Sequence, residues 1–409
     1  MAALLTVTVE GELMRRRAGK FSIVDLLQGL RTSRGVAWFA VGAMMGASIL
    51  LVRLSLNELN EVQARSYEDG RANVNLTEGT AGTKENDAGW SPSLGSIAGQ
   101  GGEKSTIGKE TAKKEQDALD QLVVRVYLTK EKRIESVPLE TYVRGVVAAE
   151  MPIGFELEAL KAQAIAARTY MVRRMVQGND SGVPVKGADV TDTTEHQVYI
   201  SLSALAEKWS GDEQKSNIGK LTDAIEQTKG MIITYQGEPI DAAFFSTSNG
   251  YTENSEDYWQ QKIPYLRSVA SPWDQAISPK YKETVKLSLK DFYSKLGLSK
   301  KQASKSSIRV IEKTQGNRIS KIAIGETTLT GREVREKLGL ASSQFIWSIK
   351  GNTISITTYG YGHGVGMSQY GANGMAESGA SAEDILSHYY SSVQVEQASK
   401  LPNLVASRS

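Results

Sequence analysis

Residues 138–150 read PLETYVRGVVAAE, and Met151 and Pro152 follow them. Proline is tolerated in the first turn of a helix and stops a helix that reaches it, so this stretch predicts a helix that ends just before Pro152. Glu150 comes eleven positions after Leu139, which at about 100° per residue places it about 20° past three full turns. Glu150 therefore extends the predicted apolar stripe of the helix, which consists of Leu139, Val143, Val146 and Val147.

A carboxyl group on this stripe is the most informative feature of the sequence. A buried position and the negative end of a helix dipole both raise the pKa of a carboxyl group. A raised pKa is what a general acid needs near neutral pH. The alternative is an ordinary helix-terminal glutamate that reaches solvent or pairs with a nearby arginine such as Arg168. Helix geometry alone leaves both interpretations open for Glu150.

A second helix is predicted over residues 156–176, ELEALKAQAIAARTYMVRRMV, because alanine and leucine are strong helix formers. Its small residues allow close packing, so most of it is expected in the core. Arg168 and Tyr170, near its C-terminal half, are candidates to reach the Glu150 site. Two short strands are predicted before the first helix, at VVRVYLT and RIESV.

Further elements are expected along the rest of the chain. The sequence predicts a helix at 221–229, strands at HQVYI and GMIITYQGEPI, a hairpin around the QGN of residues 315–317, amphipathic helices at LKDFYSKLG and TGREVREKLG, and a last helix at 382–390 that begins with Ser381 as its N-cap.

Composition excludes several kinds of chemistry. The 409 residues include 48 Lys and Arg against 46 Asp and Glu, for a net charge of +2, so no basic face for nucleic acid is indicated. There is no cysteine, which excludes a thiolate nucleophile, a disulfide, an iron–sulfur cluster and a Cys-ligated zinc. Only three histidines are present. Catalysis must therefore rest on carboxylates, hydroxyls, Lys, Arg or very few imidazoles.

An uncharged run of 18 residues, GVAWFAVGAMMGASILLV, lies between Arg34 and Arg53. As a helix it is about 27 Å long, just enough to cross a hydrocarbon core. The excess of basic residues before it predicts a cytoplasmic N-terminus and a C-terminal domain outside the cell. A cleaved signal peptide and a buried soluble helix are the alternatives. The long basic leader and the aromatic residues at the boundary favour an uncleaved single-pass anchor in the cell membrane.

The predicted fold class is α+β: a single N-terminal transmembrane helix, a disordered tether and a mixed helix/strand extracytoplasmic domain with an inserted smaller α+β subdomain. The tether is expected to be flexible, since its apolar residues are too sparse to offset the entropy of ordering it. The predicted parts are the basic tail 1–34, the transmembrane anchor 35–53, the linker 54–118, the catalytic domain 119–397 with an accessory subdomain at about 277–350, and the tail 398–409.

Two polar motifs are suited to contacting a ligand. FFSTSNGYTE places hydroxyls and an amide from Ser246 to Asn249 on a turn, which suits a polyhydroxylated or amide-bearing ligand. The alternative is a polar turn capped by its own side chains. The glycine-rich TYGYGHGVGMSQYGA holds His363, Ser368 and Gln369, and it lacks the spacing and the βαβ context of a dinucleotide loop. His196, within HQVYI, is more typical of a hydrogen-bonded structural histidine than of a metal ligand.

Five motifs occur in the order VVAAEMP, EALKAQAIAARTY, QVY, FFSTSNGYTE and GYGHGVGMSQYGA. Together they resemble the stage II sporulation protein D family, from about Val123 to Val395. The resemblance implies a membrane-anchored lytic transglycosylase that remodels peptidoglycan during engulfment in sporulating bacteria. It cleaves between N-acetylmuramic acid and N-acetylglucosamine, and it forms 1,6-anhydro ends on strands stripped of their stem peptides. Relatives include enhancers of cell-wall amidases, so a non-catalytic glycan-binding enhancer or scaffold is the alternative.

The resemblance also assigns residues and partners. The family's catalytic glutamate lies in AAEMP, which here is Glu150. The motifs nominate the following residues for glycan binding: Arg168, Tyr170, Gln197, Tyr199, Ser246, Ser248, Asn249, Tyr251, His363, Ser368 and Gln369. Stage II sporulation proteins P and M are the partners that the resemblance implies. No cofactor is expected.

The implied chemistry needs a single carboxyl group. Glycosidases that use water generally need two carboxylates, whereas in a lytic transglycosylase a hydroxyl of the substrate attacks within the same molecule. The chain departs from the family in having His196 where a cysteine is frequent, and Asn249 followed by Gly250 where two glycines are frequent. Some relatives place zinc near QVY with His and Cys. Without cysteine no such site is expected here, and metal bound through His196 and oxygen ligands stays open.

Overall fold

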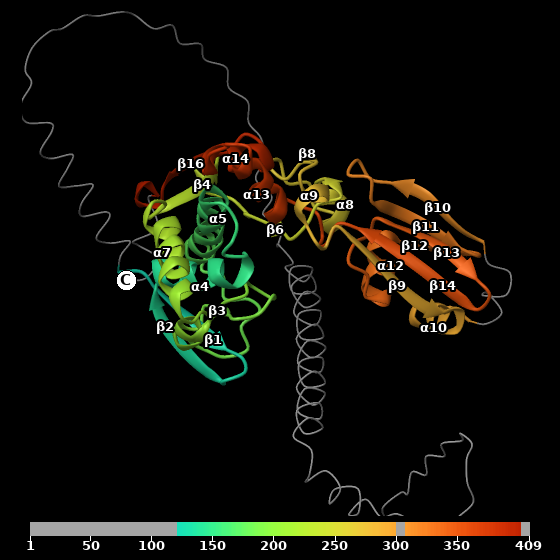
Figure 1. Cartoon of the computed structure of the whole chain (residues 1–409), viewed down its shortest axis with the longest axis horizontal. Coiled ribbons are helices and arrows are strands. Elements are labelled where there is room, and N and C mark those ends of the chain that lie inside the picture. Colours follow the sequence, from blue (N-terminus) through green and yellow to red (C-terminus); the bar gives the residue numbers. More distant parts are fainter. Residues whose placement is uncertain (1–120, 300–306, 402–409) are drawn as a thin grey trace, which may run out of the picture. The chain divides into compact units, whose positions relative to one another are not determined.

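The computed structural model describes residues 121–299 and 307–401 (Figure 1). The predicted basic tail, membrane anchor and linker, and residues 402–409, lie outside this described part of the chain. Within it, every helix is too short or too polar to cross a membrane. Helices and strands are mixed, which confirms the α+β class for the domain.

The main body is built around one buried helix, α5 (Leu157–Val176). It packs against α4 (Leu139–Glu150), α7 (Asp212–Glu226), α13 (Gln369–Glu377), α14 (Ala382–Tyr389) and β4 (Met231–Tyr235). The alanines of α5 are completely buried, so neighbouring elements approach its backbone closely. This helix is the centre of the larger of two apolar cores.

Small sheets cover the edges of this core. In the first, β1 (Val123–Leu128) pairs antiparallel with β2 (Arg133–Pro138) and parallel with β3 (Val190–Thr191). In the second, β4 lies between β5 (Glu238–Pro239) and the C-terminal strand β16 (Gln394–Gln397). The helix α6 (Leu202–Glu207) lies between the two sheets in sequence, and the short helix η2 (Ala398–Lys400) follows β16.

The polar motifs lie on short strands and turns beside α13. There, β6 (Phe244–Phe245) pairs with β15 (Met367–Ser368), and β7 (Gly250–Tyr251) pairs with β8 (Ala270–Ser271). Two short helices, α8 (Ser255–Trp259) and α9 (Asp274–Ile277), complete this region. Strands that lie more than 100 positions apart in sequence, as β6 and β15 do, bring the two motifs together.

Residues 282–359, which include most of the predicted accessory subdomain, have an apolar core of their own. We call residues 282–359 the accessory lobe. One of its sheets joins β13 (Phe345–Lys350), β14 (Thr353–Tyr359) and β9 (Lys282–Ser288), and the other joins β10 (Ile308–Lys313), β11 (Ile319–Ile324) and β12 (Thr327–Thr330). The helices α10 (Leu289–Lys295) and α12 (Gly331–Leu338) pack against these sheets. The lobe extends past residue 350, because β14 is the central strand of its sheet.

The turn between β10 and β11 joins the accessory lobe to the main body. The Gly316 carbonyl accepts a hydrogen bond from Asn249 Nδ2 at 2.8 Å. Thr314 Oγ1 donates to Glu253 Oε1 at 2.9 Å, and Arg318 Nη1 lies 3.9 Å from the same oxygen. A Cβ atom on Gly316 would lie 1.8 Å from Glu253 Oε1, so only glycine fits there. The hairpin predicted around QGN is thus confirmed, and its turn is a contact between the two cores.

Most other local predictions hold. The first two helices have the predicted C-terminal ends, and α14 begins with the capping box of Ser381 and Asp384. Helix α7 begins at Asp212, nine positions before the predicted start, because its first two turns are polar and largely exposed. The strand predicted at HQVYI is wrong: residues 197–200 belong to no strand. The Val198 N–H in this segment donates to a side chain of α4 instead.

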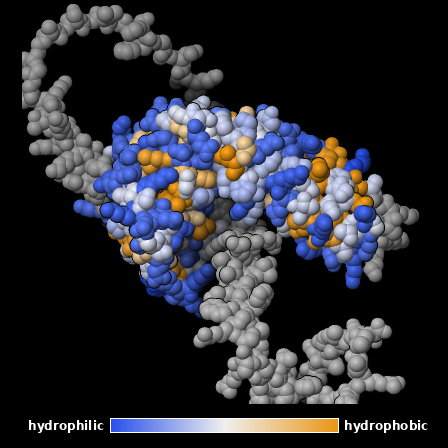
Figure 2. All heavy atoms as spheres, viewed as in Figure 1, coloured by the Kyte–Doolittle hydropathy of each residue, from blue (hydrophilic) through white to orange (hydrophobic). Residues whose placement is uncertain are grey.

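Figure 2 shows hydrophobic residues at the surface of the accessory lobe. Ile311, Ile346 and Ile349 of this lobe are exposed. In the same view, most of the described residues at the surface of the main body are hydrophilic.

Candidate active site around Glu150

Glu150 is the last residue of α4, and its side chain is partly exposed. Its Oε1 accepts a hydrogen bond from the Val198 N–H at 3.0 Å. The helix ends here because Pro152 follows, and the backbone becomes extended at Met151. The carboxylate is therefore fixed by the backbone of the 196–200 segment while part of it stays accessible. The sequence predicted a buried carboxyl group, and the Glu150 side chain is only partly buried.

Tyr142, two turns before Glu150 on α4, contacts the segment that holds the carboxylate. It is fully buried, and its hydroxyl donates to Gln197 Oε1 at 3.1 Å. Its ring stacks on Tyr199 with 5.5 Å between centroids. Burial raises the pKa of Tyr142 well above its usual range, and the negative charge of Glu150 acts in the same direction. The Tyr142 hydroxyl therefore remains a hydrogen-bond donor at any physiological pH.

Tyr142 was missed by the sequence analysis, although a signal exists. Tyr142, Val146 and Glu150 are spaced by four, and residues with this spacing form one ridge on a helix surface. A tyrosine on the ridge of a candidate carboxylate could have been nominated from the spacing alone.

Tyr170 and Arg168 lie on opposite sides of α5, since two positions correspond to about 200° of rotation. Tyr170 is partly exposed, and its assignment to the Glu150 site stays a prediction. Arg168 is completely buried and forms a two-pronged ion pair with Glu140, at 2.9 and 2.6 Å. Its Nη1 also donates to the Met231 carbonyl at 3.0 Å. Arg168 thus cannot touch a glycan in this conformation, and it pairs with Glu140 rather than with Glu150.

The serines of the two polar motifs converge on a buried carboxylate, Asp274. Ser248 donates to it through its N–H at 2.7 Å and its hydroxyl at 3.1 Å. The hydroxyls of Ser368 and Ser271 donate to it at 2.5 and 2.9 Å. Burial raises the pKa of Asp274, although these hydrogen bonds oppose the rise. Ser248 and Ser368 are therefore interior residues that join the motifs, which corrects their assignment as glycan contacts.

His363 is also committed to the fold. It is 2% exposed, and its ring lies among Phe245, Tyr258 and Trp259. Its Nε2 donates to the Phe244 carbonyl at 3.0 Å, and its Nδ1 accepts from the Val365 N–H at 3.1 Å. Since both ring nitrogens are engaged by backbone groups, His363 is not placed to bind a glycan.

The remaining nominated residues divide by exposure. Gln197, Tyr199, Asn249 and Gln369 are buried. Asn249 holds the accessory lobe, and Gln369 Nε2 reaches Gln163 Oε1 at 3.4 Å. Tyr251 is 43% exposed and Ser246 is partly exposed. Glu150, Tyr170, Ser246 and Tyr251 are thus the nominated residues that a ligand can reach.

Two buried side-chain amides each have a nitrogen without a hydrogen-bond partner among the described residues. Gln163, on α5, and Gln197 are completely buried, and the Nε2 atom of each has no hydrogen-bond partner within the described part of the chain. Buried donors are normally satisfied. Gln163 and Tyr170 are seven positions apart and therefore share one face of α5.

His196 supports a loop rather than a metal. Its Nδ1 accepts from the Thr191 N–H at 3.2 Å, and its Nε2 donates to the Ser181 carbonyl at 3.1 Å. Both nitrogens are therefore occupied. Across residues 121–299 and 307–401, no group of three or more His, Asp or Glu side chains is arranged to hold a metal ion.

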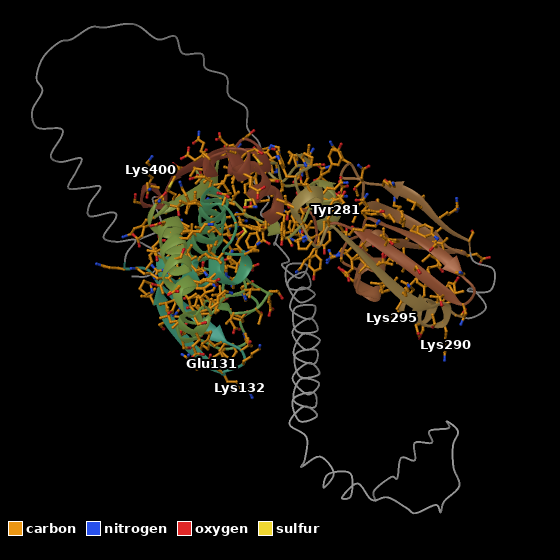
Figure 3. The ribbon with its side chains drawn as sticks, viewed as in Figure 1. Glu131, Lys132, Tyr281, Lys290, Lys295 and Lys400 are labelled. Atoms are coloured by element: carbon orange, nitrogen blue, oxygen red, sulfur yellow. The ribbon has the colours of Figure 1, made fainter. Side chains whose placement is uncertain are left out.

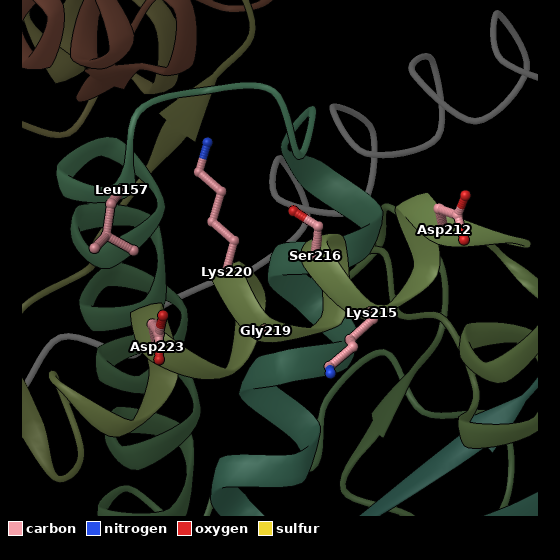
Figure 4. Close-up of a pocket in the computed structure, with 7 residues that line it drawn as sticks. All are labelled: Leu157, Asp212, Lys215, Ser216, Gly219, Lys220 and Asp223. Atoms are coloured by element: carbon pink, nitrogen blue, oxygen red, sulfur yellow. The ribbon is translucent and has the colours of Figure 1, made fainter.

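A shallow surface groove of about 560 Å³ lies along α7 (Figure 4). It is lined by Leu157, Asp212, Lys215, Ser216, Gly219, Lys220 and Asp223. Its two lysines and two aspartates balance in charge, and none of the nominated residues lines it. This groove is therefore separate from the Glu150 site.

A family profile described as "Stage II sporulation protein" matches residues 127–235. "Stage II sporulation protein D" of Bacillus subtilis strain 168 is 47% identical over 303 residues, which cover 74% of this chain and 87% of that protein. The protein of the same name from Bacillus amyloliquefaciens is 49% identical, over 72% of this chain and 83% of its own.

The chain belongs to the stage II sporulation protein D family. An "Amidase enhancer" of B. subtilis strain 168 is also similar, with 32% identity over 60% of this chain and 39% of that protein. The part matched by the family profile contains α4, α5 and the 196–200 segment, and hence Glu150, Tyr142, Tyr170 and Gln197. The buried Asp274 network lies outside it. The family is one of sporulation, so a role in sporulation follows.

Proposed function

We propose that this member of the stage II sporulation protein D family is a lytic transglycosylase that cleaves peptidoglycan glycan strands with Glu150. The observation that carries the proposal is the position of Glu150, a partly exposed carboxylate at a helix end that is anchored by the Val198 N–H. A catalytic acid must be fixed and also accessible, and Glu150 meets both conditions. Its protonated neighbour Tyr142 holds the segment that anchors it.

One carboxyl group is sufficient for this reaction. Protonated Glu150 gives its proton to the glycosidic oxygen as the bond from C1 of N-acetylmuramic acid to that oxygen breaks. The resulting carboxylate then takes the proton of the C6 hydroxyl, whose oxygen bonds to C1 and closes the 1,6-anhydro ring. No water is consumed, and Glu150 ends protonated as it began. The reaction therefore does not need the second carboxylate that hydrolases require.

The proposal includes the setting of the enzyme. Residues 35–53 hold the chain in the cell membrane, with the basic tail in the cytoplasm and the described domain outside. The substrate is a glycan strand stripped of its stem peptides, and stage II sporulation proteins P and M are the proposed partners. The uncharged run between Arg34 and Arg53 and the family membership support this setting.

The test uses the full chain and purified glycan strands that an amidase has stripped. Wild-type protein is expected to release fragments with 1,6-anhydro ends, detected by mass spectrometry. Glu150→Gln should abolish these products while strands still bind. Glu238→Gln is the matched control, since Glu238 is exposed at the start of β5. Anhydro ends formed at the wild-type rate by the Glu150→Gln variant would rule the assignment out.

The second candidate is a non-catalytic enhancer of a cell-wall amidase. Two observations favour it: a similar protein is named "Amidase enhancer", and most nominated glycan contacts are buried. If the wild-type chain forms no anhydro ends but accelerates an added amidase, this second function is correct. If it forms anhydro ends without any amidase, the first is.

A further inference from the structure

The sheet formed by β9, β14 and β13 in the accessory lobe has one side that faces away from the lobe's core (Figure 1). Side chains alternate between the two sides of a strand. The register pairs Lys282 with Tyr359 and Lys286 with Ser355, and it pairs Lys350 with Thr353. The buried residues Ile354 and Ile356 lie on the opposite side. The outer face therefore consists of the even-numbered residues 282–288, the odd-numbered residues 353–359 and the even-numbered residues 346–350.

The composition of this outer face is one-sided. It contains three lysines, Lys282, Lys286 and Lys350, together with three threonines, three serines, Tyr359 and Ile346. It contains no aspartate or glutamate. Glu283 lies on the inner side, since it pairs with buried Thr358. The lysines Lys290 and Lys295, labelled in Figure 3, belong to α10 and are not part of this face.

The lysines of the outer face have no ionic partner within the described residues. On the other sheet of the lobe, by contrast, Lys321 pairs with Glu312 at 2.8 Å. Lys282 instead has its Nζ 5.8 Å from the centre of the Tyr359 ring. Ser288, at the Lys350 end of the face, donates its hydroxyl to the Asp291 carboxylate of α10 at 2.7 Å. A face with one sign of charge attracts and retains ligands of the opposite sign.

Lysine and tyrosine also continue from this face toward the polar motifs. Lys280, just before β9, has its Nζ 4.6 Å from the centre of the Tyr361 ring. Tyr361 in turn exchanges two backbone hydrogen bonds with Thr247, next to Ser246. Beyond Ser246, whose carbonyl accepts from the Tyr370 N–H, the ring of Tyr370 meets Phe155 edge to face at 4.9 Å. Phe155 is only five positions after Glu150. Contacts, together with short stretches of chain, thus lead from the start of β9 to Phe155.

The spacing of the charges fits an extended ligand. The Cα atoms of Lys282 and Lys286 are about 13 Å apart along β9. Lys350 lies on β13, about 10 Å across the sheet from β9, because β14 lies between them. Hydroxyl groups fill the positions between them. A polymer with separated negative charges and many hydroxyls fits such a face better than a compact anion does. A lipid surface fits less well, because Ile346 is the only aliphatic side chain on the face.

We propose that the outer face binds the glycan strand itself, through the lactyl carboxylates of its muramic acid residues. The inference rests on the proposed function for the identity of the polymer. A stem peptide occupies the lactyl carboxyl as an amide, so this group is negatively charged only after the peptide has been removed. The lysines of the outer face therefore contact a carboxylate that an intact strand does not offer at this position. The accessory lobe supplies substrate selection, and the Glu150 site supplies the chemistry.

The test measures binding by the full chain with the Glu150→Gln substitution, so that strands are not cut. The probes are stripped glycan strands and the same strands with their lactyl carboxyls converted to primary amides. Exposed ion pairs are individually weak, so the triple variant Lys282→Gln, Lys286→Gln and Lys350→Gln should bind stripped strands about tenfold more weakly. Amidated strands should bind the chain that keeps all three lysines about as weakly as stripped strands bind the triple variant. The difference in affinity between the parent chain and the triple variant should vanish at high salt.

The matched control replaces three exposed lysines of the main body, Lys130, Lys215 and Lys400, with glutamine, which changes the net charge equally. It should bind like the parent chain. Equal binding of stripped and amidated strands, or unchanged binding by the triple variant, would overturn the inference. So would a lysine-dependent preference for anionic vesicles or for a polyol-phosphate polymer. Failure of the proposed function is seen separately, as an absence of anhydro ends with wild-type protein, because binding is measured without cleavage.

Discussion

The Tyr142 hydroxyl donates a hydrogen bond to Oε1 of Gln197 at 3.1 Å, and the neighbouring Val198 N–H donates to Glu150. Tyr142 and Glu150 lie two turns apart on α4. One helix therefore holds the 196–200 segment at two points, and the segment in turn orients the carboxylate. Removing either contact should affect the other.

Tyr142→Phe tests this coupling. The substitution leaves the ring stacked on Tyr199 and removes one hydrogen bond, which typically contributes about 1 kcal/mol. We expect kcat for formation of anhydro ends to fall about tenfold while KM changes little, since Tyr142 positions Glu150 without touching the substrate. Steady-state kinetics on stripped strands measure both constants. Tyr127→Phe, on β1, is the control. An unchanged kcat would show that Glu150 does not depend on this contact.

Glu253 should make stability fall with rising pH. Burial raises its pKa to about 7, and nearby Arg318 only partly opposes this. Because the folded-state pKa exceeds the usual value of 4.5, the folded protein binds the extra proton, and stability is lost as pH rises from about 4.5 through about 7. Thermal melts across this range should show the loss in wild-type protein and a smaller one in Glu253→Gln.

Glu256 supplies a comparison of opposite sign. Its hydrogen bonds with Arg267 lower its pKa to about 2. The stability that it contributes is therefore present above about 4.5 and is lost as pH falls toward 2. The stability of Glu256→Gln should differ from that of wild-type protein only above this acidic pH range. If both variants change the melting curve in the same direction with pH, the assignment for Glu253 is wrong.

Asp274→Ala should destabilise the protein strongly. The substitution removes the acceptor of the Ser248 N–H and of three serine hydroxyls, and unsatisfied buried donors are costly, so we expect a loss of about 3–5 kcal/mol. Asp274→Asn keeps one acceptor oxygen and should cost less. Urea unfolding at constant pH measures both. Equal losses would show that packing rather than hydrogen bonding determines stability here.

Arg168→Met should likewise act on the fold and not on glycan binding. It leaves the Glu140 carboxylate without its partner, and breaking such a pair typically costs about 3–5 kcal/mol. The double variant with Glu140→Gln should recover part of this stability, as a double-mutant cycle can show. Below its melting temperature the single variant should bind stripped strands normally. Weaker binding by folded Arg168→Met would restore Arg168 as a glycan contact.

Local features were predictable from the sequence because their causes are local. Pro152 ends α4, and the polar cap of Ser381 and Asp384 begins α14, both within a few residues of the feature they determine. The position of Glu150 at the end of an apolar stripe follows from the same local periodicity. The sequence also placed one carboxylate, Glu150, in the candidate catalytic role, and this assignment stays a prediction.

The burial of the polar motifs was not predictable, because their partners are distant in sequence. Ser248 and Ser368 look like ligand contacts on glycine-rich turns, yet both bind Asp274, which lies 26 and 94 positions away. His363 bonds to a carbonyl 119 positions away. The segment HQVYI has the composition of a strand, but a side chain of α4 takes the hydrogen bond that a neighbouring strand would have used. Hydroxyl and imidazole groups suit a core network as well as a binding site, and only the tertiary partners distinguish the two.

The pairing of β16 with β4 has a consequence for how the chain is made. Gln394 to Gln397 form the edge of a sheet whose central strand begins at Met231, and Ala398 donates to the Gly230 carbonyl. Residues 394–398 must therefore leave the ribosome before this sheet can close. Until then, one edge of β4, which is made much earlier, lacks its partner strand.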